Sequence, residues 1–232
     1  MVAPAQAGDM AKALAFQQPH TSLEVFAFYE TSYAAQKSLL KSLKIPSKMM
    51  KKAAGFQGSS TLQSQDGKQV ITLAQWQDVA SYHAYTPMTL VNGADAVLSE
   101  PARTIVFETA IAQTSIPNAT PALRGKEAVV QLVQFTPNTP DVQPQVLAQV
   151  EELIPTLLNQ QPIPQSVLLL TSTEDNAIAL IVNWNCSAGF ADVGEPTAIA
   201  ISPSLAALAN HTQQLYNVVN IIPAEPKKDQ KQ

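Results

Sequence analysis

The sequence predicts an α+β protein built from two copies of one β-α-β-β-α-β unit. The only two tryptophans, Trp76 and Trp184, lie 108 positions apart (184 minus 76). Each closes an apolar run, 70–76 or 177–184, that follows a polar, acidic turn. Helix and strand patterns then recur in the same order around each run. A repeat of this length is a whole small domain rather than a solenoid unit.

The first half has clear start and stop signals for its elements. Ser32 is the expected N-cap of the first helix, which Pro46 interrupts. Asp66-Gly67 is a tight-turn signal between two strands, and Asp78 is the expected cap of the second helix. Hydrophobic periodicity then predicts, in order, strand 23–29, helix 32–43 with a continuation through 54, strand 56–64, strand 68–77, helix 78–85 and strand 103–112.

The second half repeats this order. Glu174-Asp175-Asn176 is the expected hairpin turn, and Ser204 is the expected cap of the last helix. Residues 187–203 are an insertion without a counterpart in the first half. The predicted elements are strand 128–135, helix 142–158, strands 167–173 and 177–185, helix 204–212 and strand 215–222. Each half therefore has the ferredoxin-like order.

These patterns divide the chain into five parts. Pro117 and Pro121 mark the linker between the two repeats. The predicted organisation is a leader at 1–19, a first repeat at 20–112, a linker at 113–125, a second repeat at 126–223 and a disordered tail at 224–232.

Composition excludes several classes of function. A net charge of −4 argues against nucleic acid as a partner, because phosphate binding needs clustered cations, and the Lys-rich stretch 48–52 is expected to be the solvated rim of a helix. The sequence has no run of about 18 apolar residues, so no membrane span is expected. It also has no recognisable secretion signal, so the expected location is the cytoplasm. The single cysteine, Cys186, excludes an internal disulfide and is expected to be a small packed residue. No metal-ligand spacing or glycine-rich phosphate loop occurs, so no metal or cofactor is expected.

The first half resembles the antibiotic biosynthesis monooxygenase domain family. The resemblance rests on Gly55-Phe56 opening the hairpin, on 70–76 ending in Trp, and on Asp78, Ala80 and Tyr82 after it. It covers about 90 residues in the first half and, more weakly, about 95 in the second. The family forms dimeric α/β barrels, in which two four-stranded sheets pack face to face. The resemblance thus implies a barrel built within one chain, and a monomer with an internal pseudo-dimer.

The hairpin strands fit a sheet that is covered on two sides. In the strand at 68–77, Val70 and Trp76 lie on one face, and Ile71 and Leu73 on the other. Both faces are apolar, as expected when helices cover one and a second sheet covers the other. Alternation alone does not tell which face meets the helices.

The resemblance also implies a pocket between sheet and helices that the strand-end Trp faces. The candidate pocket residues are Trp76, Tyr82, His83, Tyr85, Arg103 and Trp184. Many members have a His nine positions after the Trp. Here Tyr85 takes that place and His83 lies two residues earlier, which argues against a haem ligand. The alternatives are that both tryptophans are core residues and that His83 lies at the surface or the pocket rim.

The first half is the expected location of any pocket. In the second half, Asn183 and Asn185 alternate onto the face opposite Trp184, so the three side chains cannot line one pocket. The first hypothesis for function is a small-molecule-binding protein, a cofactor-free monooxygenase acting on a hydrophobic aromatic substrate. The alternative is a non-catalytic ligand-binding or interaction protein on the same fold, and a haem-binding variant ranks third.

Overall fold

The computed structural model describes residues 13–16, 22–91, 100–125, 128–172, 174–184, 190, 194 and 196–223. Cys186, Asn185, the tail at 224–232 and much of the insertion at 187–203 lie outside these described residues.

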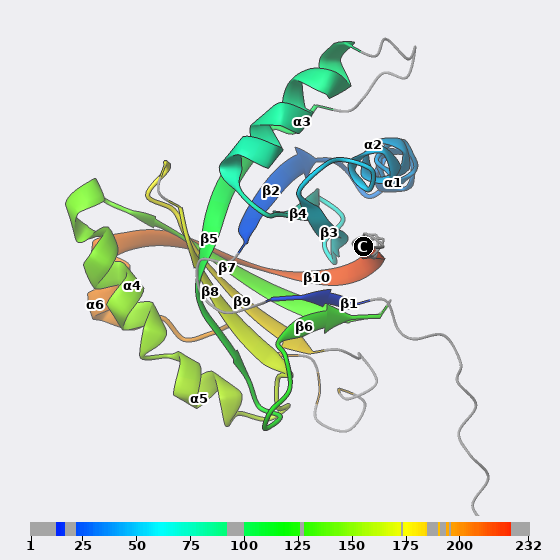
Figure 1. Cartoon of the computed structure of the whole chain (residues 1–232). Coiled ribbons are helices and arrows are strands. Elements are labelled where there is room, and N and C mark those ends of the chain that lie inside the picture. The colour runs from blue at the N-terminus through cyan, green and yellow to red at the C-terminus, as the bar shows by residue number, and fades with distance from the viewer. Residues whose placement is uncertain are drawn as a thin grey trace, which may run out of the picture.

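Eight antiparallel strands close into one barrel (Figure 1), in the order β10-β3-β4-β2-β5-β8-β9-β7. The prediction of two ferredoxin-like repeats that form an intramolecular α/β barrel is confirmed. Their bounds are β2 (Leu23–Glu30), β3 (Phe56–Ser64), β4 (Gln69–Trp76), β5 (Arg103–Thr114), β7 (Val129–Pro137), β8 (Ser166–Thr171), β9 (Ile178–Trp184) and β10 (Ala209–Pro223).

The last strand of each repeat joins the two sheets. β5 pairs with β2 through residues 103–108 and with β8 through residues 108–114. β10 pairs with β7 through 209–217 and with β3 through 216–223. Each of the two strands has a register irregularity where it passes between partners, which bends it around the barrel. Closure in this way removes the sheet edges that would otherwise be free to pair.

Helices cover the barrel on two opposite sides (Figure 1). The first repeat supplies α1 (Gln36–Ser42), α2 (Lys44–Met50) and α3 (Val79–Val91). The second supplies α4 (Gln143–Glu151), α5 (Ile154–Leu158) and α6 (Pro203–Leu208), with a 3-10 turn, η1 (Pro140–Val142), before α4. None of the described helices is long and apolar enough to cross a membrane.

The barrel interior holds the central core. Ile71 and Leu73 of β4 point inward, where they meet Phe26 and, from the other repeat, Leu168 and Ile181. Trp76 lies in a separate outer cluster with residues of the helical layer. The Trp-bearing face of the hairpin is therefore the face that the helices cover.

A two-stranded antiparallel ribbon closes one end of the barrel. It consists of β1 (Ala13–Ala15) from the leader and β6 (Ala122–Arg124) from the linker. Its side chains Leu14 and Leu123 are at most 1% exposed and belong to the interior core. Two equivalent carboxamides hold the ribbon: Gln75 Nε2 donates to the Ala15 carbonyl at 3.0 Å, and Asn183 Nδ2 donates to the Ala122 carbonyl at 2.9 Å.

Several predicted boundaries differ from the structure. The helix predicted at 204–212 ends at Leu208, because residues 209–217 extend β10 along β7. Its N-cap is Ser202 rather than Ser204, since Ser202 Oγ accepts from the Leu205 N–H at 3.1 Å. The helix predicted at 142–158 is two helices, α4 and α5. Pro46, which is predicted to interrupt the first helix, lies within α2. The predicted Asp78 cap is confirmed, with Oδ1 accepting from the Ser81 N–H at 2.7 Å.

Gly55 allows the hairpin to approach α3 closely. Its φ is +77°, and a Cβ added there would collide with the Ser81 side chain. We expect Gly55→Ala to lower the free energy of unfolding by about 2 kcal/mol, measured by urea denaturation. Gly125→Ala is the matched control, because Gly125 has the same φ but nothing near its Cβ position. If Gly125→Ala lowered the free energy of unfolding as much as Gly55→Ala, the close approach of Gly55 to Ser81 would contribute nothing to stability.

Candidate functional site

The structure brings together three of the predicted pocket residues, Trp76, Tyr82 and Tyr85. The Trp76 ring lies 6.0 Å from the Tyr82 ring and 5.2 Å from the Tyr85 ring, centroid to centroid. Phe56 meets Trp76 edge-on at 5.6 Å. We call these four side chains the aromatic cluster. It lies on the outer face of the first repeat's sheet, beneath the start of α3.

Local sequence explains this arrangement. Trp76 ends β4, and Asp78 caps α3 two residues later. Tyr82 and Tyr85 are three positions apart on α3, so both lie on the helix face that meets Trp76. His83 is exposed and contacts the Tyr82 ring at 5.4 Å. The structure thus places His83 at the surface beside the cluster.

The aromatic cluster has an unusual polar feature at its centre. Trp76 is 1% exposed, and its Nε1–H has no hydrogen-bond acceptor within the described part of the chain. The equivalent Trp184 Nε1–H donates to the Pro162 carbonyl at 3.3 Å. A buried donor without an acceptor costs about 1–3 kcal/mol. The first repeat therefore holds a polar group that an added acceptor would stabilise.

The neighbouring phenols are neutral hydrogen-bonding groups at ordinary pH. Burial raises the pKa of Tyr85 to about 12, and the nearby Tyr29 adds to the rise. Burial also raises the pKa of Tyr29 above its usual value, with Tyr82 contributing in the same direction. Such groups can donate a hydrogen bond to an oxygen atom, but they are poor proton acceptors near neutral pH.

The outer faces of the two sheets differ in side-chain volume. Where the second repeat has larger apolar side chains, the first has small or polar ones at positions related by the strand registers. These pairs, first repeat before second, are Ala27 and Val133, Thr61 and Leu169, Thr72 and Leu180, and Ala74 and Val182. In the second repeat these residues form one apolar core with Trp184, whose ring meets Phe190 at 5.9 Å. Trp184 is thus a core residue of the other sheet.

Arg103 does not lie with the aromatic cluster. It begins β5 on an inward-facing position, and its guanidinium lies 4.5 Å above the centre of the Phe28 ring. Its Nη2 donates to Gln134 of the second repeat. Trp76 faces outward from the same sheet, so the barrel wall separates the two residues.

Arg103 lines a cavity at the open end of the barrel, which we call the barrel mouth. The cavity has a volume of about 620 Å³ and is lined by residues of both repeats, including Glu30, Gln69, Arg103, Gln134, Gln214 and Tyr216. Sequence reasoning missed this site, because it forms only when the repeats face each other. One sequence signal could have indicated this site: the inward-facing side chains of several strands change from apolar to polar near the strand end that lies at the mouth.

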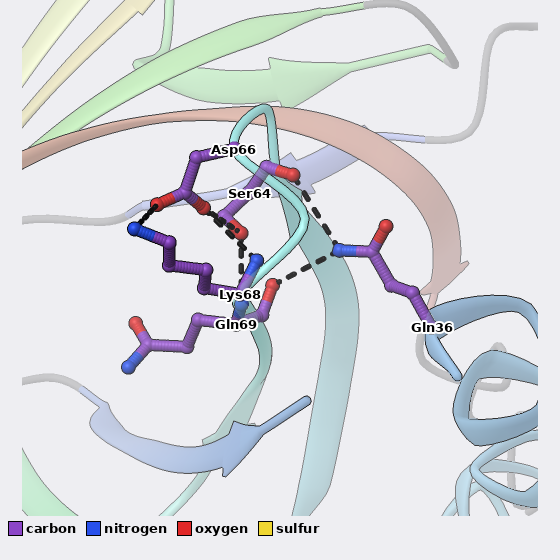
Figure 2. Close-up of polar contacts among 5 residues, drawn as sticks. All are labelled: Gln36, Ser64, Asp66, Lys68 and Gln69. Carbon is purple, nitrogen blue, oxygen red and sulfur yellow. Dashed lines mark hydrogen bonds and ion pairs between the residues drawn. The ribbon is translucent and has the colours of Figure 1, made fainter. Parts of the chain in front are cut away.

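The β3–β4 turn forms one wall of the barrel mouth and is held rigidly (Figure 2). Asp66 accepts from Ser64 Oγ at 2.8 Å and from the Lys68 N–H at 3.0 Å. Those bonds, the Lys68 N–H most of all, lower the pKa of Asp66. Gln36 of α1 donates to the carbonyls of Ser64 and Gln69 at 3.4 Å each, which ties the hairpin to the helical layer.

The described residues include no group of three or more His, Cys, Asp or Glu side chains that could hold a metal ion.

Comparison with solved structures identifies the fold. An anthrone oxidase-like protein superposes with a TM-score of 0.68 and 14% sequence identity, over 93% of this chain and 98% of that one. A candidate monooxygenase from Fusobacterium nucleatum has a TM-score of 0.56 and 12% identity, over 93% and 96%. Another from Lactobacillus acidophilus NCFM has a TM-score of 0.52 and 8% identity, over 88% and 97%. No family model and no curated protein matches the chain. The chain shares the α/β-barrel fold of these structures, as predicted.

Proposed function

We propose that this protein binds a flat, hydrophobic aromatic molecule at the aromatic cluster of the first repeat. The observation that carries the proposal is the buried Trp76 Nε1–H, which has no acceptor among the described residues. The ligand would supply an oxygen atom as that acceptor. Its rings would lie against Phe56, Tyr82 and Tyr85, which offer stacking area at little cost in side-chain entropy.

The composition of the sheet supports the first repeat as the ligand-binding half. Its outer face carries Ala27, Thr72 and Ala74, where the second repeat carries larger side chains. The second repeat fills its own sheet–helix layer with an apolar core. Its role in this proposal is to close the barrel behind the first sheet.

The proposed reaction is oxygenation by molecular oxygen without a cofactor. The similar structures include an anthrone oxidase-like protein and candidate monooxygenases, which makes this class the first to test. In an anthrone-type substrate, a methylene group conjugated to an aryl ketone loses a proton to form an enolate, and molecular oxygen accepts the electrons of that enolate. The methylene carbon gains one oxygen atom as a new carbonyl. The other oxygen atom leaves as water with the two hydrogens that the methylene carbon has lost, so atoms and electrons balance.

In this proposal, Trp76 stabilises the enolate. A hydrogen bond from Nε1–H to the enolate oxygen would favour the anion over the neutral ketone, because the negative charge develops on that oxygen. The Tyr85 phenol, which its raised pKa keeps neutral, lies against the Trp76 ring. Arg103, in the barrel mouth, takes no part.

We expect Trp76→Phe to weaken the binding of anthrone roughly tenfold and to slow oxygen uptake at least as much. Phenylalanine keeps the apolar ring but removes the N–H. Isothermal titration measures binding, and an oxygen electrode measures uptake. Trp184→Phe is the matched control, since Trp184 lies in the other repeat, and it should leave both values unchanged.

The outcomes separate the two hypotheses for function. Binding that depends on Trp76, without oxygen uptake, would favour the non-catalytic alternative. No binding of anthrone, or equal binding by both variants, would contradict the site itself.

A further inference from the structure

We propose that the barrel mouth is a second binding site, which takes a small zwitterion of the α-amino-acid type. This site does not depend on the aromatic cluster, because it lies at the end of the barrel interior and not under α3. The β1–β6 ribbon fills the opposite end with Leu14 and Leu123. The barrel is therefore open to solvent at the mouth, where the described cavity of about 620 Å³ lies.

The barrel mouth contains an oriented cation. Phe28 supports one face of the Arg103 guanidinium, and Gln134 accepts a hydrogen bond from Nη2. These two contacts come from different repeats and fix the plane of the group. Among the described residues, no carboxylate forms an ion pair with Arg103. Its remaining N–H groups can therefore bind a carboxylate in the two-pronged geometry that guanidinium favours.

The barrel mouth also contains a carboxylate, that of Glu30, which forms no ion pair with the other described residues. Glu30 lies two residues after Phe28 on β2, so its side chain projects to the same inward side of the sheet. It lines the same cavity as Arg103. Within the described ranges, its carboxylate has neither a hydrogen bond nor an ion pair.

The other ionisable side chains that line the barrel mouth contact neighbouring residues. Asp66 and Lys68 form an ion pair at 3.9 Å, and Asp66 is bonded to its own turn (Figure 2). His211 lies against the Phe135 ring on the outward side of β10, at 6.1 Å. On the inner side, Tyr216 donates to Gln69, and burial raises the pKa of Tyr216 far above its usual range. This phenol is therefore neutral.

Among the described residues that line the barrel mouth, Arg103 and Glu30 form no ion pair, and this combination of charges selects the ligand class. A simple anion would be attracted to Arg103 but repelled by Glu30. A simple cation would be attracted to Glu30 but repelled by Arg103. A zwitterion places its carboxylate on Arg103 and its ammonium group on Glu30. The carboxamides of Gln69, Gln134 and Gln214 can then bind further polar groups of the ligand.

The test uses the full chain and a panel of free α-amino acids as probes, added at millimolar concentration. We expect at least one of them to raise the melting temperature, with binding confirmed by isothermal titration. The N-acetyl derivative of that amino acid lacks the ammonium group, and its amide lacks the carboxylate. Both should bind roughly tenfold more weakly or worse.

Two variants assign the charges. Arg103→Gln should remove the preference for the free amino acid over its amide, and Glu30→Gln should remove the preference over the N-acetyl form. Lys37→Gln, on α1 and outside the barrel mouth, should change neither. The proposal is overturned if no free amino acid binds, if the blocked forms bind equally well, or if the mouth variants behave like the control. Loss of anthrone binding in Trp76→Phe has no bearing on this result.

Discussion

Replacing Leu123 by alanine is expected to lower the free energy of unfolding by about 3 kcal/mol. Leu123 is fully buried at the centre of β6, directly paired with Leu14 of β1. Both side chains close the end of the barrel and belong to the interior core. Truncation removes buried methyl groups and leaves a cavity that the closed barrel cannot easily collapse around.

Urea denaturation at fixed pH measures this effect. Ile116→Ala is the matched control, because Ile116 lies in the same linker but is 45% exposed. It should change the free energy of unfolding by about 0.5 kcal/mol or less. If Leu123→Ala behaved like this control, the ribbon would be a surface attachment and not part of the core.

Replacing Glu24 by glutamine is expected to remove a pH dependence of stability. Glu24 faces the barrel interior near the ribbon, is 0% exposed, and corresponds to Val130 in the second repeat. Its Oε1 accepts from Ser22 Oγ at 2.7 Å, whereas Oε2 has no partner within the described part of the chain. Burial raises the pKa of Glu24 to about 7, and the bond from Ser22 offsets only part of that rise.

The direction of the pH dependence follows from this pKa. Below about pH 4.5, the carboxyl is protonated in both the folded and the unfolded chain, so folding carries no ionisation penalty. Between about pH 4.5 and 7 the unfolded chain loses this proton while the folded chain keeps it, so the free energy of unfolding falls as pH rises. Above about pH 7 the full penalty, about 3 kcal/mol, remains.

The measurement is the free energy of unfolding of the parent and of Glu24→Gln across this pH range. The advantage of the variant should grow by about 3 kcal/mol from pH 4.5 to 7 and then stay constant. Glu151→Gln, on the exposed side of α4, should show no such growth. A constant difference between Glu24→Gln and the parent across the range would mean that Glu24 ionises as it does in water.

Local signals in the sequence predict most of the elements. The Asp66-Gly67 turn, the Asp78 cap and the strands that end at Trp76 and Trp184 are each predicted from a few neighbouring residues. All of them are present in the structure. The contact of Trp76 with Tyr82 and Tyr85 also follows from local spacing, because strand end, cap and helix are consecutive.

Long-range contacts decide what these signals cannot. The sequence analysis places Arg103 and Trp76 among the candidates for one pocket, yet they face opposite sides of the barrel wall. The helix predicted through 212 is too long, because the pairing of β10 with β7 overrides local helical preference after Leu208. The short strands β1 and β6 carry too few residues for a strand pattern, and they form only against each other.

The sequence by itself predicted a duplicated unit, its element order and three members of the aromatic cluster, Trp76, Tyr82 and Tyr85. Only the tertiary structure decided which sheet face lies inside, which end of the barrel is filled, and that Glu30 and Arg103 share an open mouth. The reason is physical: caps, turns and periodicity act over a few residues. The inside of a barrel is defined only when strands more than 100 residues apart pair and close it.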